Sequence, residues 1–458
     1  MRILIYGINF HPEPTGIGKY TGEMTNWLAG RGHEVRVVTA PPFYPQWRVL
    51  PGSRAWKYSR ERFRLQNGNG NGKTASGQHA QGPYAEIFRC PIWVPENPKG
   101  AKRLLHLASF GLSSVPQIVR QVRWLPDIVL LVEPTLFCAL QTLLVARWSG
   151  AKAWLHIQDF EIDAAFELGD FSSSRVRDWA LAVERRMLSV FDRVSAISNR
   201  MVDHLCAKGV DPSRRILFPN WVDTAEIYPL AGPSPFRREL GIAESTVVAL
   251  YSGSMGKKQG LDLLVDAARQ LSHRPDLRFV FCGEGPGRQI SVDNAKDLPN
   301  VSLLPVQPAD RLNDLLNLAD IHLLPQLSAT ADLVMPSKLT GMMASGRAIV
   351  ATAHPGTQLF GVLEGRGIVT PPGDVDSFVS TLFRLAENLS LREQLGQEAR
   401  RYAVSHLGRE EILYRFEQSM LSACGIPCLE AGTEPFATGK GKLAVEKSPM
   451  AVGNIGDD

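Results

Sequence analysis

The sequence predicts an α/β protein whose two halves each form a doubly wound sheet beside a shared cleft. Three observations lead to this prediction. Apolar runs typical of buried strands alternate with helical patterns in both halves. The alternation stops at residues 220–235, which are rich in proline and polar residues, and restarts at residue 247. The 458 residues, 44% of them hydrophobic, suffice for two ordinary cores.

The first half opens with a strand, a helix and a second strand. Residues 3–6 are predicted to form a buried strand, and a glycine-containing loop runs from there to Gly18. A helix is expected over residues 19–29 and the next strand over residues 35–39. This order predicts a parallel, Rossmann-like sheet with right-handed crossovers. Further strands, each followed by a helix, are expected at residues 127–132, 153–157 and 193–197.

The second half repeats the alternation. Strands are expected at residues 247–251, 277–282, 301–304, 321–324 and 348–351. We therefore divide the chain into an N-terminal domain of residues 1–223 and a C-terminal domain of residues 224–406. Residues 407–430 are expected to hold a helix that crosses back to the first domain. Ligands of doubly wound sheets bind at the carboxyl ends of the strands, so the cleft between the halves is the expected site.

Composition and charge exclude several classes of protein. The formal net charge of +4 is small for this length and argues against a nucleic-acid partner. The six cysteines lack the paired spacing of a metal knuckle, which favours reduced thiols in a cytoplasmic protein. No segment reaches the roughly 20 apolar residues of a membrane span, so any membrane contact is expected to be peripheral. Residues 66–82 are predicted to be a flexible insert and residues 431–458 a disordered tail.

Three loops have the composition of anion-binding sites. Each joins small or basic residues to the start of a predicted helix, where backbone amides and the helix dipole favour a phosphate. The candidate residues in these loops are Gly16, Gly18, Ser254, Lys257, Lys258, Ser337 and Lys338. Each loop also has a structural reading, as a tight turn, a solvated basic turn or a proline-led helix start. Three such loops at one cleft favour a phosphate-bearing ligand.

Two further candidates follow the predicted strand of residues 153–157. Asp159 is a carboxylate that can act as a general base or orient a bound ligand, and His156 can hydrogen-bond one. The alternative is that Asp159 caps the next helix and that His156 is packed in the core.

These residues resemble the family-four retaining glycosyltransferases over residues 1–406. The resemblance lies in Gly16-Ile17-Gly18, Pro219-Asn220-Trp221-Val222-Asp223, Gly283-Glu284-Gly285-Pro286, Leu318-Ala319-Asp320 and Met343-Ala344-Ser345-Gly346. Within that family the chain is most similar to colanic-acid and related exopolysaccharide glycosyltransferases. The motifs that carry this closer similarity are Val132-Glu133-Pro134-Thr135, His156-Ile157-Gln158-Asp159-Phe160 and Met335-Pro336-Ser337-Lys338-Leu339.

The resemblance implies a GT-B fold, two Rossmann-like domains facing a central cleft. It implies a nucleotide-sugar donor held mainly by the second domain, with Gly283 and Gly285 among its contacts. It also implies an acceptor held by the first domain, where Asp159 would orient or deprotonate the acceptor hydroxyl and His156 would hydrogen-bond the transferred sugar. It further implies retention of anomeric configuration and no need for a metal or other cofactor.

The sequence departs from the family at two places. Many members carry two glutamates eight residues apart at the donor, and here Leu333 and Gly341 occupy those positions. Asp332 is the candidate to contact the donor's hexose hydroxyls instead. The family's usual arginine and lysine of the phosphate loop fall on Ser254 and Gln259. Lys257 or Lys258 is then expected to supply the loop's positive charge.

The function that the resemblance implies is transfer of a sugar, with GDP-fucose as the expected donor. The expected acceptor is a polyprenyl-diphosphate-linked oligosaccharide of exopolysaccharide synthesis. Two alternatives stay open, a non-catalytic nucleotide-sugar-binding module and a nucleotide-sugar epimerase or dehydrogenase. The first loop lacks the G-x-G-x-x-G spacing of the latter.

A membrane surface is a further expected partner. Residues 101–125 combine apolar side chains with four basic ones, and Lys57, Arg60, Arg62 and Arg64 form a second basic cluster. Such stretches favour the headgroup region of anionic membranes. The alternative is that the apolar face belongs to the core and the charges are its solvated side.

Overall fold

The computed structural model describes residues 1–64, 83–96, 100–134, 136–160, 174–256, 259–285, 287–327 and 336–427. Two segments predicted to be unstructured, residues 66–82 and 431–458, lie outside the described residues. So do three predicted site residues, Lys257, Lys258 and Asp332.

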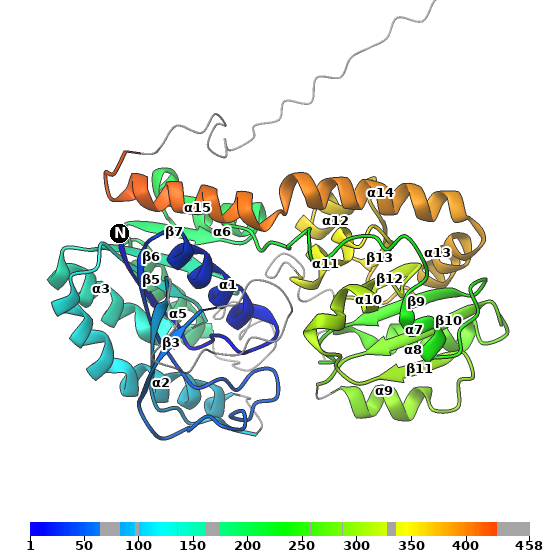
Figure 1. The fold of residues 1–458 in the computed structure, drawn as a ribbon, viewed down its shortest axis with the longest axis horizontal. Coiled ribbons are helices and arrows are strands. Elements are labelled where there is room, and N and C mark those ends of the chain that lie inside the picture. Colours follow the sequence, from blue (N-terminus) through cyan, green and yellow to red (C-terminus); the bar gives the residue numbers. More distant parts are fainter. Residues whose placement is uncertain are drawn as a thin grey trace, which may run out of the picture.

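The first domain is built on a sheet with the strand order β3-β4-β2-β1-β5-β6-β7-β8 (Figure 1). All described neighbours pair in parallel except β3 and β4, which pair antiparallel. The strands are β1 (Arg2–Tyr6), β2 (Glu34–Thr39), β3 (Ser59–Phe63), β4 (Ala85–Arg89), β5 (Ile128–Val132), β6 (Lys152–Ile157), β7 (Arg193–Ala196) and β8 (Arg215–Leu217). The helices are α1 (Gly16–Gly30), α2 (Ala101–Arg120), α3 (Ala139–Ser149), α5 (Ser174–Leu188) and α6 (Asn199–Ala207).

The second domain is built on a parallel sheet with the order β11-β10-β9-β12-β13-β14. Its strands are β9 (Val247–Ser252), β10 (Leu277–Cys282), β11 (Val301–Leu304), β12 (Ile321–Leu324), β13 (Ala348–Thr352) and β14 (Ile368–Thr370). The helices are α7 (Pro235–Glu239), α8 (Leu261–Gln270), α9 (Arg288–Ala295), α10 (Leu312–Leu316), α11 (Lys338–Ala344), α12 (Gln358–Leu363), α13 (Val375–Glu387) and α14 (Leu389–His406).

Helices cover both faces of each sheet, which is why the central strands are buried over nearly their whole length. In the first domain, side chains of α2, α3 and α6 form the core of one face. Side chains of α1 and of α15 (Arg409–Ala423) form the core of the other face. In the second domain, α8 and α13 cover one face and α11, α12 and α14 cover the other.

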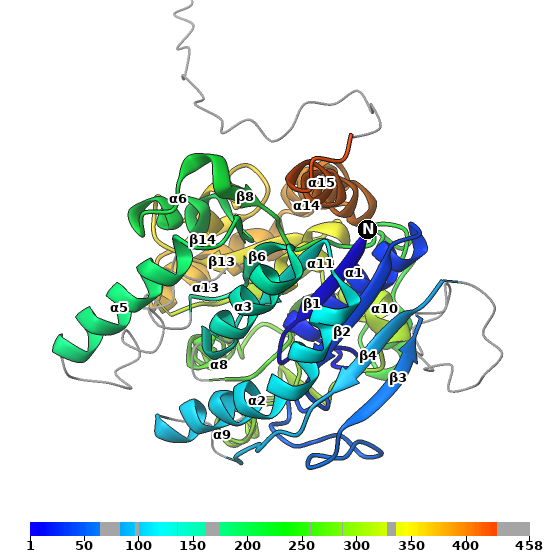
Figure 2. The same ribbon diagram turned by 90° about the vertical axis from the view of Figure 1, so that its left-hand side faces the viewer.

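The chain crosses between the domains twice, and the two crossings lie side by side. The amide of Val222 donates to the carbonyl of Leu407 at 2.8 Å, and the amide of Arg409 donates to the carbonyl of Val222 at 3.1 Å. An ion pair of 2.8 Å joins Arg409 to Asp223. After the second crossing, α15 lies on the first domain, as Figures 1 and 2 show.

Helix α15 belongs to the first domain by its contacts. The ring of Phe416 stacks on that of Phe218 with 3.6 Å between centroids. His33 shares a 2.7 Å contact with Glu417, and the indole of Trp27 donates to Glu410. The first domain is therefore assembled from residues at both ends of the described chain.

Four strands have no counterpart among the predicted ones: β3, β4, β8 and β14. The strand β3 has the sequence SRERF and lies at the sheet edge with most of its side chains exposed. An edge strand needs few apolar residues, so its sequence carries little of the alternation that identifies buried strands. The predicted basic cluster therefore belongs partly to this edge strand.

Candidate active site between the two domains

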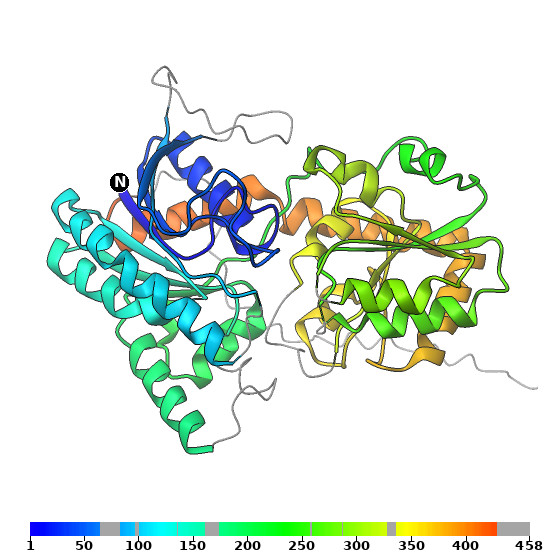
Figure 3. The same cartoon turned by 90° about the horizontal axis from the view of Figure 1, so that it is seen from below.

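The loops that follow the strands of both sheets face each other at the domain boundary (Figures 1 and 3). Two contacts join the domains there. The side chain of Tyr44, after β2, interacts with the side chain of Ser254, after β9. The hydroxyl of Tyr20 in α1 donates to the carbonyl of Ser337, which precedes α11, at 3.5 Å. Two of the predicted anion-binding loops are thus in direct contact with the first domain.

Lys338 places a positively charged group at this boundary. It is the first residue of α11, and its Nζ atom is buried although the side chain as a whole is partly exposed. Nζ lies 4.1 Å from the centroid of the Tyr251 ring and has no hydrogen-bond partner among the described residues. Burial lowers the pKa of Lys338 to about 7. A buried amine without an acceptor fits an anionic ligand that is not part of the chain.

The Lys338 side chain points at the loop that follows β9. A Cβ atom added to Gly253 would lie 3.3 Å from Cδ of Lys338 and 3.7 Å from Nζ. Gly253 has a φ of +137°, which glycine adopts readily and other residues rarely do. A glycine here therefore leaves open the space in front of the lysine.

Gly283 and Gly285 are needed for packing between two loops. A Cβ atom on Gly283 would lie 1.9 Å from the carbonyl oxygen of Gly253, and one on Gly285 would lie 2.5 Å from that of Met255. The loops are also joined by a bond from the amide of Met255 to the carbonyl of Glu284, at 2.9 Å. This packing alone accounts for both glycines, and a contact with the donor is an additional role to be tested.

Helix α1 begins at Gly16, three residues before the predicted start at residue 19. The side chain of Thr15, which precedes it, makes no capping hydrogen bond. Gly16 has a φ of +64° and lies against the ring of Tyr44. At Gly18, a Cβ atom would lie 2.4 Å from the carboxylate of Glu13. Gly18 therefore makes room for Glu13, a residue that the sequence did not indicate.

Glu13 holds the loop that carries Tyr44. Its Oε1 accepts from the backbone amides of Phe43 and Tyr44, each at 3.1 Å, and its Oε2 accepts from Asn9 at 2.9 Å. The side chain is buried, and this desolvation raises the pKa of Glu13 to about 7 against the opposing effect of those bonds. Glu13 and Tyr44 each follow a strand at its carboxyl end, which is the signal that could have found them.

Asp159 lies close to Tyr44 at the end of β6. Burial first, and then the negative charges of Asp159 and Glu13, raise the pKa of Tyr44, whereas Arg103 and the bond to Ser254 oppose the change. The structure thus brings Asp159, Tyr44 and Ser254 together across the domain boundary. The alternative reading of Asp159, as a cap of the helix after it, concerns residues outside the described ranges.

His156 is a correction to the sequence interpretation. Its Nδ1 lies 3.0 Å from the hydroxyl of Ser195 and its Nε2 lies 2.9 Å from the amide nitrogen of Gln158. The ring contacts the rings of Phe218 and Phe416 and is buried, which lowers its pKa to about 3. With both nitrogens bonded inside the core, His156 is not placed to hydrogen-bond a sugar. The alternative interpretation, in which His156 is packed in the core, agrees with these contacts.

Acidic side chains at the second domain have structural partners. The sequence holds an Asp-x-Asp pair, Asp374 and Asp376, at the start of α13. Asp374 caps that helix by accepting from the amide of Ser377 at 2.9 Å, and Asp376 accepts from Gln270 at 3.4 Å. Among the described residues, no group of three or more His, Cys, Asp or Glu side chains is arranged to hold a metal ion.

Comparison with known proteins decides the family. The model described as "Glycosyl transferase 4-like domain" matches residues 15–221, and the one described as "Glycosyl transferases group 1" matches residues 234–402. Over 91% of its length the chain is 40% identical to the putative colanic acid biosynthesis glycosyl transferase WcaI of Escherichia coli, covering 98% of that protein. The chain belongs to the group 1 glycosyltransferases. The enzyme class and the family predicted from the sequence are confirmed.

Solved structures confirm the GT-B fold of this glycosyltransferase. Sucrose-phosphate synthase from Thermosynechococcus elongatus superposes with a TM-score of 0.69 at 16% identity, covering 92% of this chain and 99% of that one. The Anabaena protein HepE, in complex with UDP and glucose, superposes with a TM-score of 0.63 at 18% identity, covering 92% and 100%.

The described site residues of this glycosyltransferase therefore lie in three kinds of surroundings: the domain boundary, the packing between loops, and the core. Gly16, Asp159, Ser254, Ser337 and Lys338 lie at the domain boundary, joined there by Tyr44 and Glu13. Gly18, Gly283 and Gly285 support loop packing, and His156 lies in the core. None of the helices in the described ranges is long and apolar enough to cross a membrane.

Proposed function

We propose that this glycosyltransferase moves a sugar, with retention of configuration, from a nucleotide diphosphate sugar to an acceptor bound by the first domain. The observation that carries the proposal is the buried Nζ of Lys338, which has no hydrogen-bond partner among the described residues and faces the loop after β9. A diphosphate supplies the negative charge and the acceptor atoms that this amine lacks.

The chemistry follows from where charge develops. Cleavage of the anomeric bond leaves negative charge on the departing diphosphate and positive charge on the sugar. The ammonium group of Lys338 stabilises the departing group. The leaving phosphate oxygen can take the proton of the acceptor hydroxyl on the same face of the sugar. This scheme requires no metal ion, so turnover is expected to survive EDTA.

Asp159 is proposed to orient the acceptor hydroxyl and to stabilise the positive charge of the sugar. Its place beside Tyr44, at the end of β6, supports a position on the acceptor side. Tyr44 lies between this carboxylate and Ser254 of the donor side. Lys257, Lys258 and Asp332 keep their proposed donor contacts, and Gly283 and Gly285 shape the loops that surround the donor.

For the substrates, the similarity to WcaI supports a role in the assembly of a colanic-acid-like exopolysaccharide. GDP-fucose is the proposed donor and a polyprenyl-diphosphate-linked oligosaccharide the proposed acceptor. The bound UDP of HepE, a protein of the same fold, makes UDP-sugars the alternative to test first.

The deciding experiment measures nucleotide release and glycolipid formation from the purified protein. GDP-fucose and a panel of UDP-sugars are each supplied with a lipid-linked oligosaccharide, with and without EDTA. Transfer from one donor that survives EDTA supports the proposal. Binding without any release of nucleotide would instead indicate a non-catalytic binding module, and a dependence on nicotinamide would indicate a dehydrogenase.

A further inference from the structure

The outer surface of the first domain carries two adjacent helices with unusually apolar exposed sides. Helices α2 and α3 pack against each other, and Figures 2 and 3 show them side by side. The large apolar side chains that they and the turn before α3 expose to solvent are Leu104, Leu105, Leu112, Val115, Val119, Phe137, Leu140, Leu144 and Trp148. We call this set the α2–α3 face. Leu112 is 75% exposed and Trp148 is 57% exposed. Large apolar side chains grouped on a surface in this way are typical of an interaction site.

Charge restricts what that partner is. The sequence has no Asp or Glu between residues 101 and 126 or between residues 134 and 158. The basic residues in these two stretches are Lys102, Arg103, Arg120, Arg123, Arg147 and Lys152. Exposed leucine and tryptophan side chains on helices whose charged residues are all basic complement the interface of an anionic lipid bilayer.

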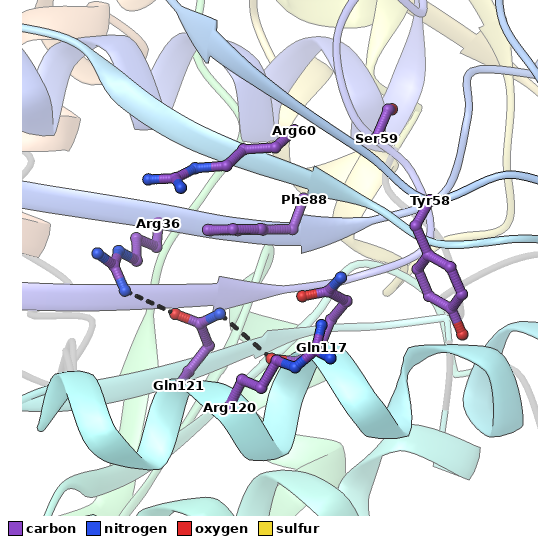
Figure 4. Close-up of a pocket in the computed structure, with 8 residues that line it drawn as sticks. All are labelled: Arg36, Tyr58, Ser59, Arg60, Phe88, Gln117, Arg120 and Gln121. Carbon is purple, nitrogen blue, oxygen red and sulfur yellow. Dashed lines mark hydrogen bonds between the residues drawn. The ribbon is translucent and has the colours of Figure 1, made fainter.

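A polar pocket opens on the flank of α2 (Figure 4). It has a volume of about 470 Å³. Arg36, Ser59, Arg60 and Phe88 reach it from the strands, Tyr58 from the chain before β3, and Gln117, Arg120 and Gln121 from the end of α2. Three guanidinium groups, two carboxamides and two hydroxyls line it, with no acidic side chain among them.

The ion pairs at the pocket leave an excess of positive charge. Arg36 and Arg60 both pair with Glu86, which is not among the lining residues. Arg36 also donates to Gln121 at 3.1 Å. The side chain of Arg120 makes no hydrogen bond or ion pair with the described residues. Three arginines against one glutamate leave two positive charges, and guanidinium forks are well suited to phosphate oxygens.

We propose that the α2–α3 face docks on a bilayer that contains anionic lipid, and that the Arg36–Arg60–Arg120 pocket receives the phosphate of a lipid headgroup. The apolar side chains enter the interface while the pocket, on the same helix, fixes the orientation. This inference extends the proposed function by naming a surface on which a lipid-linked acceptor would be met. It does not depend on transfer, because vesicle binding is measurable without any donor.

Vesicle co-sedimentation at low salt tests the proposal. One set of vesicles is phosphatidylcholine alone and the other is equal parts phosphatidylcholine and phosphatidylglycerol. The full chain is expected to bind the second set at least tenfold more tightly and to be released by salt. Equal binding to both sets, or to neither, would overturn the proposal.

Matched variants separate the two parts of the surface. Leu112→Ser with Trp148→Ser is expected to weaken binding at least tenfold, whereas Leu389→Ser, at an exposed leucine of the second domain, leaves it unchanged. Arg120→Gln is expected to weaken binding about fivefold, the ratio for one lost basic contact, and Arg238→Gln on α7 leaves it unchanged. Wild-type binding by both α2–α3 variants contradicts the docking surface.

Two controls test whether a second copy of the chain or free phosphate, and not a bilayer, occupies this surface. If the Leu112 and Trp148 substitutions converted a dimer to a monomer, the surface would be an interface between copies and the bilayer assignment would be wrong. If millimolar inorganic phosphate raised the melting temperature of the wild type but not of Arg120→Gln, the pocket would be a site for free phosphate. Nucleotide release without vesicles, measured on the same variants, shows whether the proposed function fails separately.

Discussion

The side chain of Tyr44 in the first domain interacts with the side chain of Ser254 in the second, across the domain boundary. Tyr44 lies beside Asp159, and Ser254 lies in the loop toward which Lys338 points. This contact therefore couples the position of the proposed acceptor side to that of the proposed diphosphate site. Four predictions concern Tyr44, Lys338, Glu13 and Asp159 in turn.

Tyr44→Phe removes the hydroxyl that interacts with Ser254 and keeps the ring that lies against Gly16. One lost hydrogen bond is worth about 1 kcal/mol, so we expect the rate of transfer to fall about fivefold with little change in melting temperature. Steady-state kinetics with the preferred donor measures this effect. Tyr228→Phe, at an exposed tyrosine of the second domain, is the matched control. An unchanged rate in Tyr44→Phe would show that the Tyr44 hydroxyl has no part in catalysis.

Lys338 should make nucleotide binding depend on pH. Its folded pKa is about 7 because Nζ is buried, so the ammonium form that a diphosphate needs is depleted as the pH rises above 7. Affinity for GDP or UDP is expected to fall by up to tenfold per pH unit above that value, as calorimetry can measure. Lys338→Arg stays charged and is expected to bind without this dependence, while Lys338→Met binds weakly at every pH. A flat profile in the wild type contradicts the assignment.

Glu13 should make the free energy of unfolding depend on pH, with the greater stability on the acidic side. Its pKa is raised from 4.5 to about 7 by burial, so the folded state retains a proton that the unfolded state loses. The stabilisation is fully present below about pH 4.5 and is lost as the pH rises through 7, a change of up to about 3 kcal/mol. Glu13→Gln keeps a neutral acceptor and is expected to lose less stability between pH 5 and 8. Urea unfolding across this range tests it, with the exposed Glu364→Gln as control.

Asp159→Asn is expected to preserve nucleotide affinity and to lower the rate of transfer about a hundredfold, since an amide cannot accept a proton or stabilise positive charge as a carboxylate does. Calorimetry with GDP or UDP and a transfer assay separate the two effects. The exposed Asp203→Asn on α6 is the control. If nucleotide affinity fell as far as the rate, Asp159 would be a donor contact or a structural cap.

The sequence predicted the repeating strands and helices because both sheets are covered on both faces. Strands such as Val247–Ser252 are then continuous apolar runs that stand out from the polar loops. It did not predict β3, whose charged residues suit an exposed sheet edge. The sequence also did not predict which loops of the two domains contact each other, since the contact of Tyr44 with Ser254 depends on how two separately folded domains meet.

His156 shows why a place at a strand end is not sufficient to identify a site residue. It pairs in register with Val132 and Ser195, so it is still within the sheet. Its side chain points to the face covered by Phe416, a residue 260 positions later that reaches it only because α15 returns to the first domain. Asp159 is beyond the last paired residue of the strand, where the sheet no longer sets the direction of the side chain.

The return of α15 has a consequence for synthesis on the ribosome. The core that contains Phe218 is completed by Phe416, which stacks on it at 3.6 Å. The chain is made from its N-terminus, so the second domain can fold while the first still lacks a helix of its own core. Until residues 409–423 emerge, one face of the first sheet has an uncovered apolar surface. We therefore expect nascent chains that stop at residue 406 to bind holdase chaperones, and the full chain to release them.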